Sequence, residues 1–253
     1  MSQRTLIGGL QAVQSALRYD PTRAIEAWVD RRRRDARLVK LREQLEGAGC
    51  PVQESDAKAL ARLLPDVSHQ GVVLAYQGAS PRGDADLAAH LDRLSHAPFL
   101  LILDQVQDPH NLGACLRTAD AAGVDAVIAP RDRAVGLTPV VHRVAAGAAE
   151  AMPFYQVTNL ARCLRGLKDR GIWLMGAADE AAEPLSRANF TGPLALALGA
   201  EGKGLRRLTR EHCDTLVAIP MAGHVESLNV SVAAGVLLFE AVRQRSAFMA
   251  APG

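Results

Sequence analysis

The chain has 253 residues, of which 49% are hydrophobic and 22% are charged, with a formal net charge of +2. This composition indicates a globular protein with one large or two ordinary domains. No apolar run reaches the roughly 18 residues that span a bilayer, and the first residues lack the apolar segment of a signal peptide, so we expect a cytoplasmic protein. The four cysteines are far apart and form no metal-ligand or disulfide pattern, so we expect no metal site.

The positive charge is concentrated in the N-terminal third. Residues 1–80 contain 12 Lys and Arg against 9 Asp and Glu, whereas the remainder contains 17 against 18. The centre of this charge is the stretch DRRRRDARLVKLR, which contains Arg31, Arg32, Arg33 and Arg34. A run of this kind is usually the solvated face of a helix, but arginines in a row also suit contacts with phosphate groups. Both interpretations remain open on the run alone.

The first part of the chain alternates between strand and helix patterns. Strands are expected at 24–30, near 50–55 and at 71–77, with helices at about 35–48 and 56–64 between them. The following stretch, QGASPRGDADLAAHLDRLSHAP, combines Gly, Ser and Pro with polar residues and one short helical pattern, as a linker does. We therefore expect a small α/β domain over residues 1–78 and a linker over 79–97.

The alternation resumes in residues 98–253. Strands are expected at 99–104, 124–130, 152–157, 171–177, 194–199 and 215–220, and helices at 111–122, near 138–149, at 159–170, from 203 and from 228 to about 245. Strands that are apolar throughout, such as FLLIL and LALAL, are typical of a parallel sheet covered on both faces. The second domain is therefore expected to be a doubly wound α/β domain.

Three of these strands end in segments with features of a ligand site. FLLILD leads into DQVQDPHNLGACLRTADAAG, LALAL into GAEGKGLRRL, and TLVA into IPMAGHVESLNVSVAAG. Ligands of parallel sheets bind outside the carboxyl ends of the strands. None of the segments contains GxGxxG or GxxxxGK[ST], so a plain dinucleotide or P-loop protein is not expected.

Individual residues in these segments have both structural and functional interpretations. Gly199 allows close backbone approach, and Glu201 places a carboxylate among glycines. Asn111 is as well suited to a helix N-cap as to a site, and Ser227 and Asn229 are also of the capping type. Arg117 lies in a helix of mostly small, apolar residues, so we expect it to have an anionic partner.

The three segments together resemble the motifs of the SpoU/TrmH (SPOUT) family of RNA ribose 2′-O-methyltransferases, in order and in spacing, over residues 99–245. The stretches LIGGLQAVQSALR, SHQGVVLAY and VTNLARCL are similar to the bacterial branch that methylates a guanosine of 23S rRNA. The resemblance implies S-adenosylmethionine as cofactor and a deep trefoil knot in residues 98–253, which no general rule of topology would predict. It also implies that residues 1–78 form an RNA-binding domain of the L30e/L7Ae type.

The resemblance assigns roles to the residues that match its motifs. The expected cofactor contacts are Gly199, Ile219 and Leu228. The expected catalytic group is Asn111, Arg117, Glu201, Ser227 and Asn229. Because a guanidinium stays protonated in proteins, we expect Arg117 to clamp the target phosphate and to increase the acidity of the ribose hydroxyl, with a phosphate oxygen or Glu201 as proton acceptor.

The resemblance also implies partners and leaves alternatives. The substrate is expected to be 23S rRNA or an assembly intermediate of the large subunit, and the protein is expected to be a homodimer through the helix from 228, with no membrane association. A tRNA methyltransferase of the same fold and a non-catalytic rRNA-binding protein are the alternatives. With RNA choice assigned to the first domain, we expect residues 97–253 to fold and bind the cofactor alone.

Overall fold

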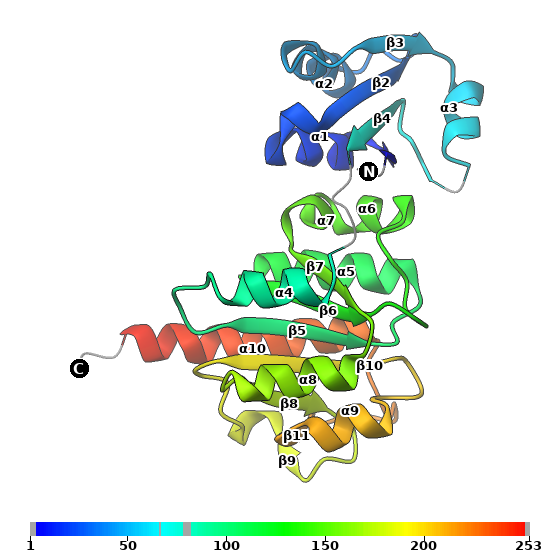
Figure 1. The fold of residues 1–253 in the computed structure, drawn as a ribbon. Coiled ribbons are helices and arrows are strands. Elements are labelled where there is room, and N and C mark those ends of the chain that lie inside the picture. The colour runs from blue at the N-terminus through cyan, green and yellow to red at the C-terminus, as the bar shows by residue number, and fades with distance from the viewer. Residues whose placement is uncertain (1–3, 66, 78–81, 251–253) are drawn as a thin grey trace. The chain divides into compact units, whose positions relative to one another are not determined.

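The computed structural model describes residues 4–65, 67–77 and 82–250, and it divides into two compact units (Figure 1). Unit 1 contains the chain up to Ser80 together with Leu137–Ala151, and unit 2 contains Pro81–Gly136 and Met152–Gly253. The junction predicted at residues 78 and 79 lies outside the described residues.

Unit 1 contains a mixed four-stranded sheet in the order β1-β4-β2-β3. Strand β4 is antiparallel to both β1 and β2, whereas β2 and β3 are parallel. Its elements are β1 (Arg4–Gly8), α1 (Leu10–Tyr19), a 3₁₀ turn η1 (Pro21–Arg23), β2 (Ala24–Asp30), α2 (Ala36–Gly47), β3 (Val52–Ser55), α3 (Ala57–Leu63), β4 (Val72–Gln77), α6 (Pro139–Ala145) and α7 (Ala148–Ala151). Strand β1 and helix α1 were not among the predicted elements.

The helices α6 and α7 belong to unit 1 although they are far from it in sequence. Both pack against α1, and Ser15 Oγ donates a hydrogen bond of 3.1 Å to the Ala146 carbonyl. A Cβ atom on Gly147 would lie 2.1 Å from the Ser15 Cβ, so only glycine fits at this contact. Unit 1 therefore includes a segment that lies within the predicted range 98–253.

A buried polar pair connects α6 to α7. His142 Nδ1 lies 2.6 Å from Glu150 Oε1, and the two side chains are 6% and 1% exposed. Burial of such groups is costly unless they are paired, so this contact fixes the two short helices to each other. The α6–α7 segment is therefore an internally fixed part of unit 1.

Unit 2 contains a seven-stranded sheet in the order β7-β6-β5-β10-β8-β11-β9, and all of its strand pairs are parallel. This confirms the predicted parallel α/β sheet. Its elements are α4 (Asp84–Leu91), β5 (Phe99–Asp104), α5 (Pro109–Ala121), β6 (Ala126–Pro130), β7 (Phe154–Val157), α8 (Leu160–Asp169), β8 (Trp173–Ala177), β9 (Glu183–Pro184), a 3₁₀ turn η2 (Leu185–Arg187), β10 (Leu194–Gly199), α9 (Arg207–His212), β11 (Thr215–Ala218) and α10 (Val230–Ala250).

The sheet of unit 2 is covered on both faces, as the continuous apolar strands predict. One face packs against α4 and α8, with Leu100, Ile102 and Leu164 in the same buried cluster. The alternate residues Leu101 and Leu103 are also fully buried and point to the opposite face, because side chains alternate along a strand. Helix α10 packs against α5 and β10 (Figure 1).

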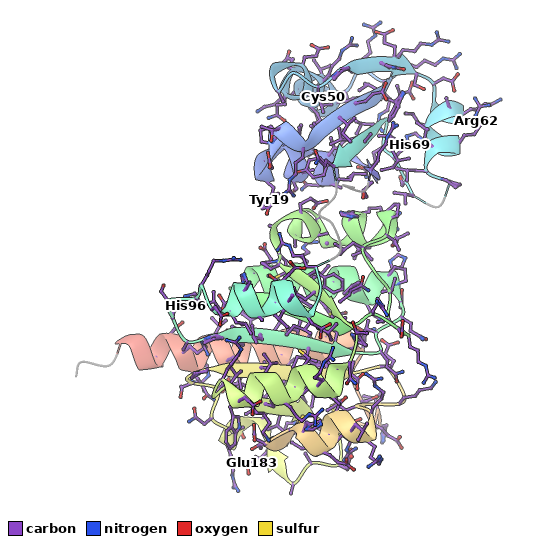
Figure 2. The ribbon with its side chains drawn as sticks, in the orientation of Figure 1. Tyr19, Cys50, Arg62, His69, His96 and Glu183 are labelled. Carbon is purple, nitrogen blue, oxygen red and sulfur yellow. The ribbon has the colours of Figure 1, made fainter. Side chains whose placement is uncertain are left out.

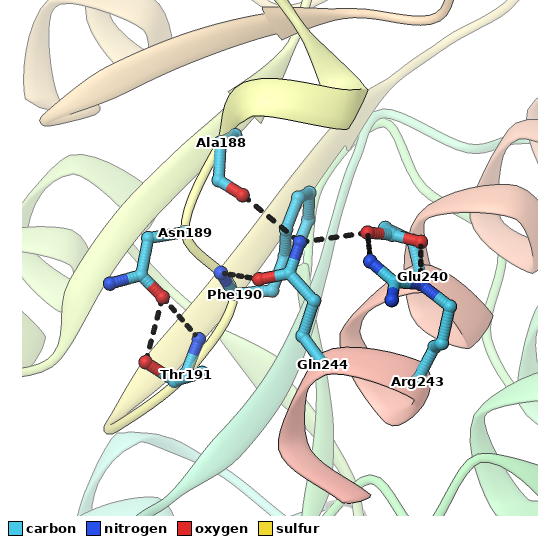
Figure 3. A network of polar contacts seen from close by, with 7 residues as sticks. All are labelled: Ala188, Asn189, Phe190, Thr191, Glu240, Arg243 and Gln244. Atoms are coloured by element: carbon cyan, nitrogen blue, oxygen red, sulfur yellow. Dashed lines mark hydrogen bonds and ion pairs between the residues drawn. The ribbon is translucent and has the colours of Figure 1, made fainter. Parts of the chain in front are cut away.

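Polar contacts fix the C-terminal half of α10 to the loop before β10 (Figure 3). Gln244 Nε2 donates to the Ala188 carbonyl at 3.0 Å, and Gln244 Oε1 accepts from the Phe190 N–H at 3.0 Å. Hydrogen bonds from Arg243 and Gln244 to Glu240 lower the pKa of Glu240 to about 2. The side-chain amide of Gln244 therefore satisfies the Ala188 carbonyl and the N–H of Phe190, whose side chain is fully buried.

Two further findings concern all described residues. Among them, no helix combines the length and the apolarity that a membrane crossing requires, and no cluster of metal-ligating side chains occurs. Burial raises the pKa of the Cys115, Cys163 and Cys213 thiols to about 12 in each case, and Cys50 lies in unit 1 with its pKa also raised by burial (Figure 2). All four cysteines are free, and burial disfavours the thiolate form of each.

The segment predicted as a linker contains a structural helix. Helix α4 buries Leu87 and Leu91 in the cluster on one face of the sheet, and the Arg82 carbonyl accepts a hydrogen bond of 2.9 Å from Gln156 N. A protein that begins at residue 97 would lack helix α4. Its helix α6 would also lose the contacts with β1 and α1 of unit 1.

We expect Leu87→Ala in the full chain to reduce the free energy of unfolding of unit 2 by about 2–5 kcal/mol, because it leaves a cavity beneath α4. Urea unfolding followed by circular dichroism measures this change. The exposed Ala89 of the same helix provides the control Ala89→Ser, with an expected change within about 0.5 kcal/mol. Equal midpoints for the two variants would contradict the structural role of α4.

Candidate cofactor and catalytic site

The strand order of unit 2 has a switch point between β5 and β10. From β5 the chain proceeds to β6 and β7 on one side, whereas β8 and β11 lie beyond β10 on the other side. At the carboxyl end of this pair, Gly199 is the register partner of Asp104. Open parallel sheets bind their ligands outside the carboxyl ends of strands at such a point, so this edge is the expected location of a site.

A cavity of ≈ 340 Å³ lies at the carboxyl ends of β8, β10 and β11. Its lining includes all three predicted cofactor residues, Gly199, Ile219 and Leu228. It also includes Glu201 and Ser227 from the predicted catalytic group. The volume falls in the usual range of small-ligand sites, which is about 300–1,000 Å³.

The cavity has more acidic than basic groups in its lining. Asp179, Glu180, Glu201 and Glu226 are the acidic side chains, and Lys203 and Arg210 are the basic ones. Glu180 is paired with Arg210, and hydrogen bonds from its own backbone N–H and from Arg210 lower the pKa of Glu180. The remaining excess of carboxylates suits a ligand that carries positive charge.

Gly199 is required by the protein's own backbone. A Cβ atom at this position would lie 1.9 Å from the Gly204 carbonyl carbon and 2.3 Å from the Leu205 nitrogen. Gly204 N donates to the Ala200 carbonyl at 2.9 Å, and Gly202 and Gly204 have φ values of 69° and 60°, which favour glycine. The loop thus folds back onto the end of β10, and this contact is distinct from the predicted contact of Gly199 with the cofactor.

Asn111, Glu201 and Asn229 meet in one hydrogen-bonded group, although they are far apart in sequence. Asn111 Nδ2 donates to Glu201 Oε1 at 3.1 Å, and Asn229 Nδ2 donates to Asn111 Oδ1 at 3.0 Å. Asn229 Nδ2 also donates to Glu201 Oε1. One residue from each of the three motif segments therefore contributes to the group.

The capping interpretations have different outcomes for the two asparagines. Helix α5 is capped by Asp108, whose Oδ1 accepts from the His110 N–H at 2.8 Å, so Asn111 is not the N-cap. Asn229 Oδ1 accepts from the Ser231 N–H at 2.9 Å at the start of α10, and Asn229 thus caps that helix. The single side chain of Asn229 connects the helix cap with the polar group of the site.

Arg117, which was predicted to need an anionic partner, lies on the exposed side of α5. Its neighbours Cys115 and Leu116 are fully buried, whereas Arg117 is exposed. Among the described residues no acidic side chain forms an ion pair with it. The apolar pattern of the helix belongs to its other side, and the guanidinium is directed to solvent.

Sequence reasoning missed a buried anchor beside the cavity. Asp104 is fully buried at the end of β5; its Oδ1 accepts from Arg206 Nε at 2.6 Å, and its Oδ2 accepts from Thr209 Oγ1 at 2.7 Å. The Arg206 N–H also donates to Asp104 Oδ2 at 3.1 Å. A charged residue at the end of an apolar strand was the available signal, and its partners lie about 100 residues away, so no local pattern reveals them.

The arginine run of unit 1 lies in a turn and not in a helix. Helix α2 begins at Ala36 after the N-cap Asp35, and Asp30 Oδ1 accepts from the Arg32 N–H at 2.9 Å in the turn before it. All four side chains are exposed, but Arg33 forms an ion pair of 2.9 Å with Asp35. The predicted RNA contacts Arg31, Arg32 and Arg34 are therefore available at the surface of unit 1.

A parallel α/β sheet with a cavity of this size at its switch point, joined to a small α/β unit, defines a two-unit protein of the cofactor-binding α/β class. Residues 98–239 match the model of the SpoU rRNA Methylase family, and residues 6–81 match the RNA 2′-O ribose methyltransferase substrate binding model. The chain therefore belongs to the SpoU rRNA methylase family.

Similar proteins cover nearly the whole chain. The 23S rRNA (guanosine-2′-O-)-methyltransferase RlmB of Shewanella oneidensis is 53% identical over 97% of this chain and 99% of its own length. The RlmB protein of Ralstonia nicotianae is 54% identical over 97% of this chain and 98% of its own length. The crystal structure of the SpoU methyltransferase AviRb from Streptomyces viridochromogenes with AdoMet has a TM-score of 0.80, with 26% identity over 95% of this chain and 90% of that chain.

We expect Gly199→Ala to abolish binding to the cavity, because the new Cβ displaces the Gly204 carbonyl and opens the loop that forms one wall. Calorimetric titration with S-adenosylmethionine measures binding, and thermal unfolding measures the cost to the fold. The control Gly166→Ala lies in helix α8, where a Cβ meets nothing within 4 Å; it should leave ligand affinity unchanged and should not lower the unfolding temperature, because Ala favours a helix more than Gly does. Unchanged ligand affinity in Gly199→Ala would show that the loop tolerates the displacement.

Proposed function

We propose that this protein transfers the methyl group of S-adenosylmethionine to the ribose 2′-hydroxyl of a guanosine in 23S rRNA. The observation that carries the proposal is the polar group of Asn111, Glu201 and Asn229 beside the ≈ 340 Å³ cavity. The relatives that are 53% and 54% identical over nearly the full chain give the substrate its identity. This role belongs to rRNA processing during ribosome assembly.

The residues of the cavity fit S-adenosylmethionine. Gly199 contributes backbone to its wall, and Ile219 and Leu228 contribute apolar surface of the kind that packs against an adenine ring. The excess of carboxylates in the lining complements the positive charges of the sulfonium and ammonium groups. When bound, the cofactor supplies an electrophilic methyl group.

The catalytic group positions and activates the ribose. The amides of Asn111 and Asn229 hold Glu201 through one carboxylate oxygen, Oε1, and these hydrogen bonds do not use its second oxygen. Ser227 lines the cavity, within the same segment as Asn229. Arg117 clamps the phosphate next to the target ribose, and a phosphate oxygen or Glu201 receives the hydroxyl proton.

Finer features of the fold are also part of the proposal. We propose that residues 98–253 form a deep trefoil knot, supported by the return of the chain from β11, which lies next to the edge strand β9, to α10, which packs on α5 and central strand β10. We propose that the strands and helices of unit 1 form an L30e-like domain that binds RNA, supported by its match to the substrate-binding model. The protein is proposed to act in the cytoplasm, on naked 23S rRNA or on an assembly intermediate.

Tritium transfer from labelled S-adenosylmethionine to unmodified 23S rRNA tests the function. We expect wild-type protein to label 23S rRNA and not tRNA; the reverse would favour a tRNA methyltransferase, and no labelling would favour a non-catalytic rRNA-binding protein. Arg117→Ala should lose at least about a hundredfold in transfer. Its affinity for S-adenosylmethionine should remain within a few-fold of wild type, and a large loss in calorimetry would remove Arg117 from the phosphate-clamping role.

We also propose that the protein is a homodimer through α10. Val232, Val236 and Phe239 are 52%, 36% and 49% exposed and follow the spacing i, i+4, i+7, which places them on one face of the helix. An apolar face of this kind on a monomer is unfavourable in water. It lies on the helix that Asn229 caps, so the interface and the polar group share one element.

We expect light scattering to give about twice the chain mass of 27.0 kDa at micromolar concentration. Phe239→Glu should shift the mass toward that of one chain, because it places a charge in the apolar face. Val39→Glu is the control, since Val39 is 47% exposed on α2 of unit 1. A wild-type mass near 27.0 kDa would exclude the dimer.

A further inference from the structure

A second cavity lies at the same edge of the unit 2 sheet as the cofactor cavity. Its volume is ≈ 500 Å³, and its lining comes from the ends of β6 and β7 and from the start of α9. The first cavity occupies the ends of the strands on one side of the β5–β10 switch point, and the second occupies the ends of β6 and β7 on the other side. The two are separated by the segment from Leu205 to Arg210, which contributes residues to both.

The second cavity is rich in arginine. Arg133, Arg206 and Arg207 are in its lining, and Asp132 is its acidic residue. Arg206 is paired with the buried Asp104, and Arg207 is paired with Glu211 on the next turn of α9. For Arg133 the described residues provide no ion-pair partner, and its side chain is exposed. The lining itself thus has three guanidinium groups against one carboxylate, and the carboxylates paired with Arg206 and Arg207 lie outside it.

The loop that carries Arg133 is held in place. The Arg131 N–H donates to the Val157 carbonyl at 2.9 Å, and the Val135 N–H donates to the Val106 carbonyl at 3.0 Å, so both ends of the loop are fixed to the sheet edge. Between them, Arg133 has a φ of 60°, a left-handed conformation that is uncommon for a residue with a side chain. Such backbone strain persists where the surrounding structure imposes it, and it is frequent at ligand sites.

Neutral hydrogen-bonding groups complete the second cavity. Thr158 and Asn159 follow strand β7, and Asn159 Oδ1 is already used as the cap of α8, accepting from Arg162 N at 3.0 Å. The cavity therefore combines guanidinium groups with hydroxyl and amide groups. This is the set of donors that proteins direct at phosphate oxygens.

We infer that the second cavity binds a phosphodiester of the RNA strand that carries the target nucleotide, with Arg133 and Arg207 as its contacts. The inference rests on the proposed function, in which the RNA must reach the cavity that holds the methyl donor. A strand seated on the second cavity lies directly beside the first. Unit 2 then grips the RNA itself, and the substrate-binding role is not confined to unit 1.

The test uses the full chain and an unmodified 23S rRNA transcript in filter-binding titrations at several salt concentrations. We expect the double variant Arg133→Ala with Arg207→Ala to raise Kd roughly tenfold, because two charge-assisted contacts are lost. The slope of log K against log salt should become shallower by about 1.5, since fewer counterions are released. Arg133→Lys should retain the wild-type slope, because the slope follows charge.

Matched controls separate this result from damage to the fold. Arg165 is exposed on α8 outside the cavity, and Arg165→Ala should bind RNA as wild type does. All variants should bind S-adenosylmethionine with unchanged affinity. The inference would be overturned if the double variant and Arg165→Ala had equal Kd values and equal slopes of log K against log salt. It would also be overturned if Arg133→Lys had a shallower slope than wild type.

A parallel assay of methyl transfer by wild-type protein distinguishes the two levels of the proposal. If the wild-type protein transfers methyl groups and the double variant binds RNA as the wild type does, the second cavity is ruled out as an RNA site and the proposed function is retained. If the wild-type protein transfers no methyl groups, the proposed methyltransferase function is excluded. The comparison of RNA binding between the double variant and wild type then still decides whether the second cavity holds RNA.

Discussion

The close approach of Gly199 to the Gly204 carbonyl is the constraint on which the site depends. With no side chain at residue 199, the loop after β10 turns back onto the strand end, and this turn forms one wall of the cavity. The same turn carries Glu201, which thereby reaches Asn111 of α5 and Asn229 at the start of α10. A single backbone contact thus fixes both the cofactor wall and the polar group.

Asp104 secures the other end of the same loop. It is the register partner of Gly199, and it holds Arg206 and Thr209 through both of its oxygens. A fully buried carboxylate is unfavourable unless it is paired and hydrogen-bonded, so these partners are required once Asp104 occupies the strand end. The loop between Gly199 and Arg206 is therefore fixed at both ends, which suits a site that must hold its ligand in one orientation.

The sequence predicted the parallel sheet and the strand ends that surround the cavity because these follow from local patterns. Apolar runs such as FLLIL mark strands buried on both faces, and glycines after LALAL mark a close turn. It failed where long-range packing decides the outcome. The helices at 139–151 join unit 1 through Ser15 and Gly147, and the partners of Asp104 lie about 100 residues away. The exposure of Arg117 also could not be derived from its mostly apolar helix, because such a helix still has an exposed side.

The division of labour predicted from charge alone changes once the charges are placed in space. Unit 2 has almost equal numbers of acidic and basic residues, yet four of its acidic residues line the first cavity and three of its arginines line the second. A near-zero net charge is therefore compatible with one cavity lined mostly by carboxylates and a neighbouring cavity lined mostly by guanidinium groups. Since the two cavities share the segment from Leu205 to Arg210, a strand held in one is placed beside the ligand of the other. In the proposed mechanism, proximity of the two reactants then follows from the architecture of one sheet edge, and unit 1 is assigned the selection of the RNA that arrives there.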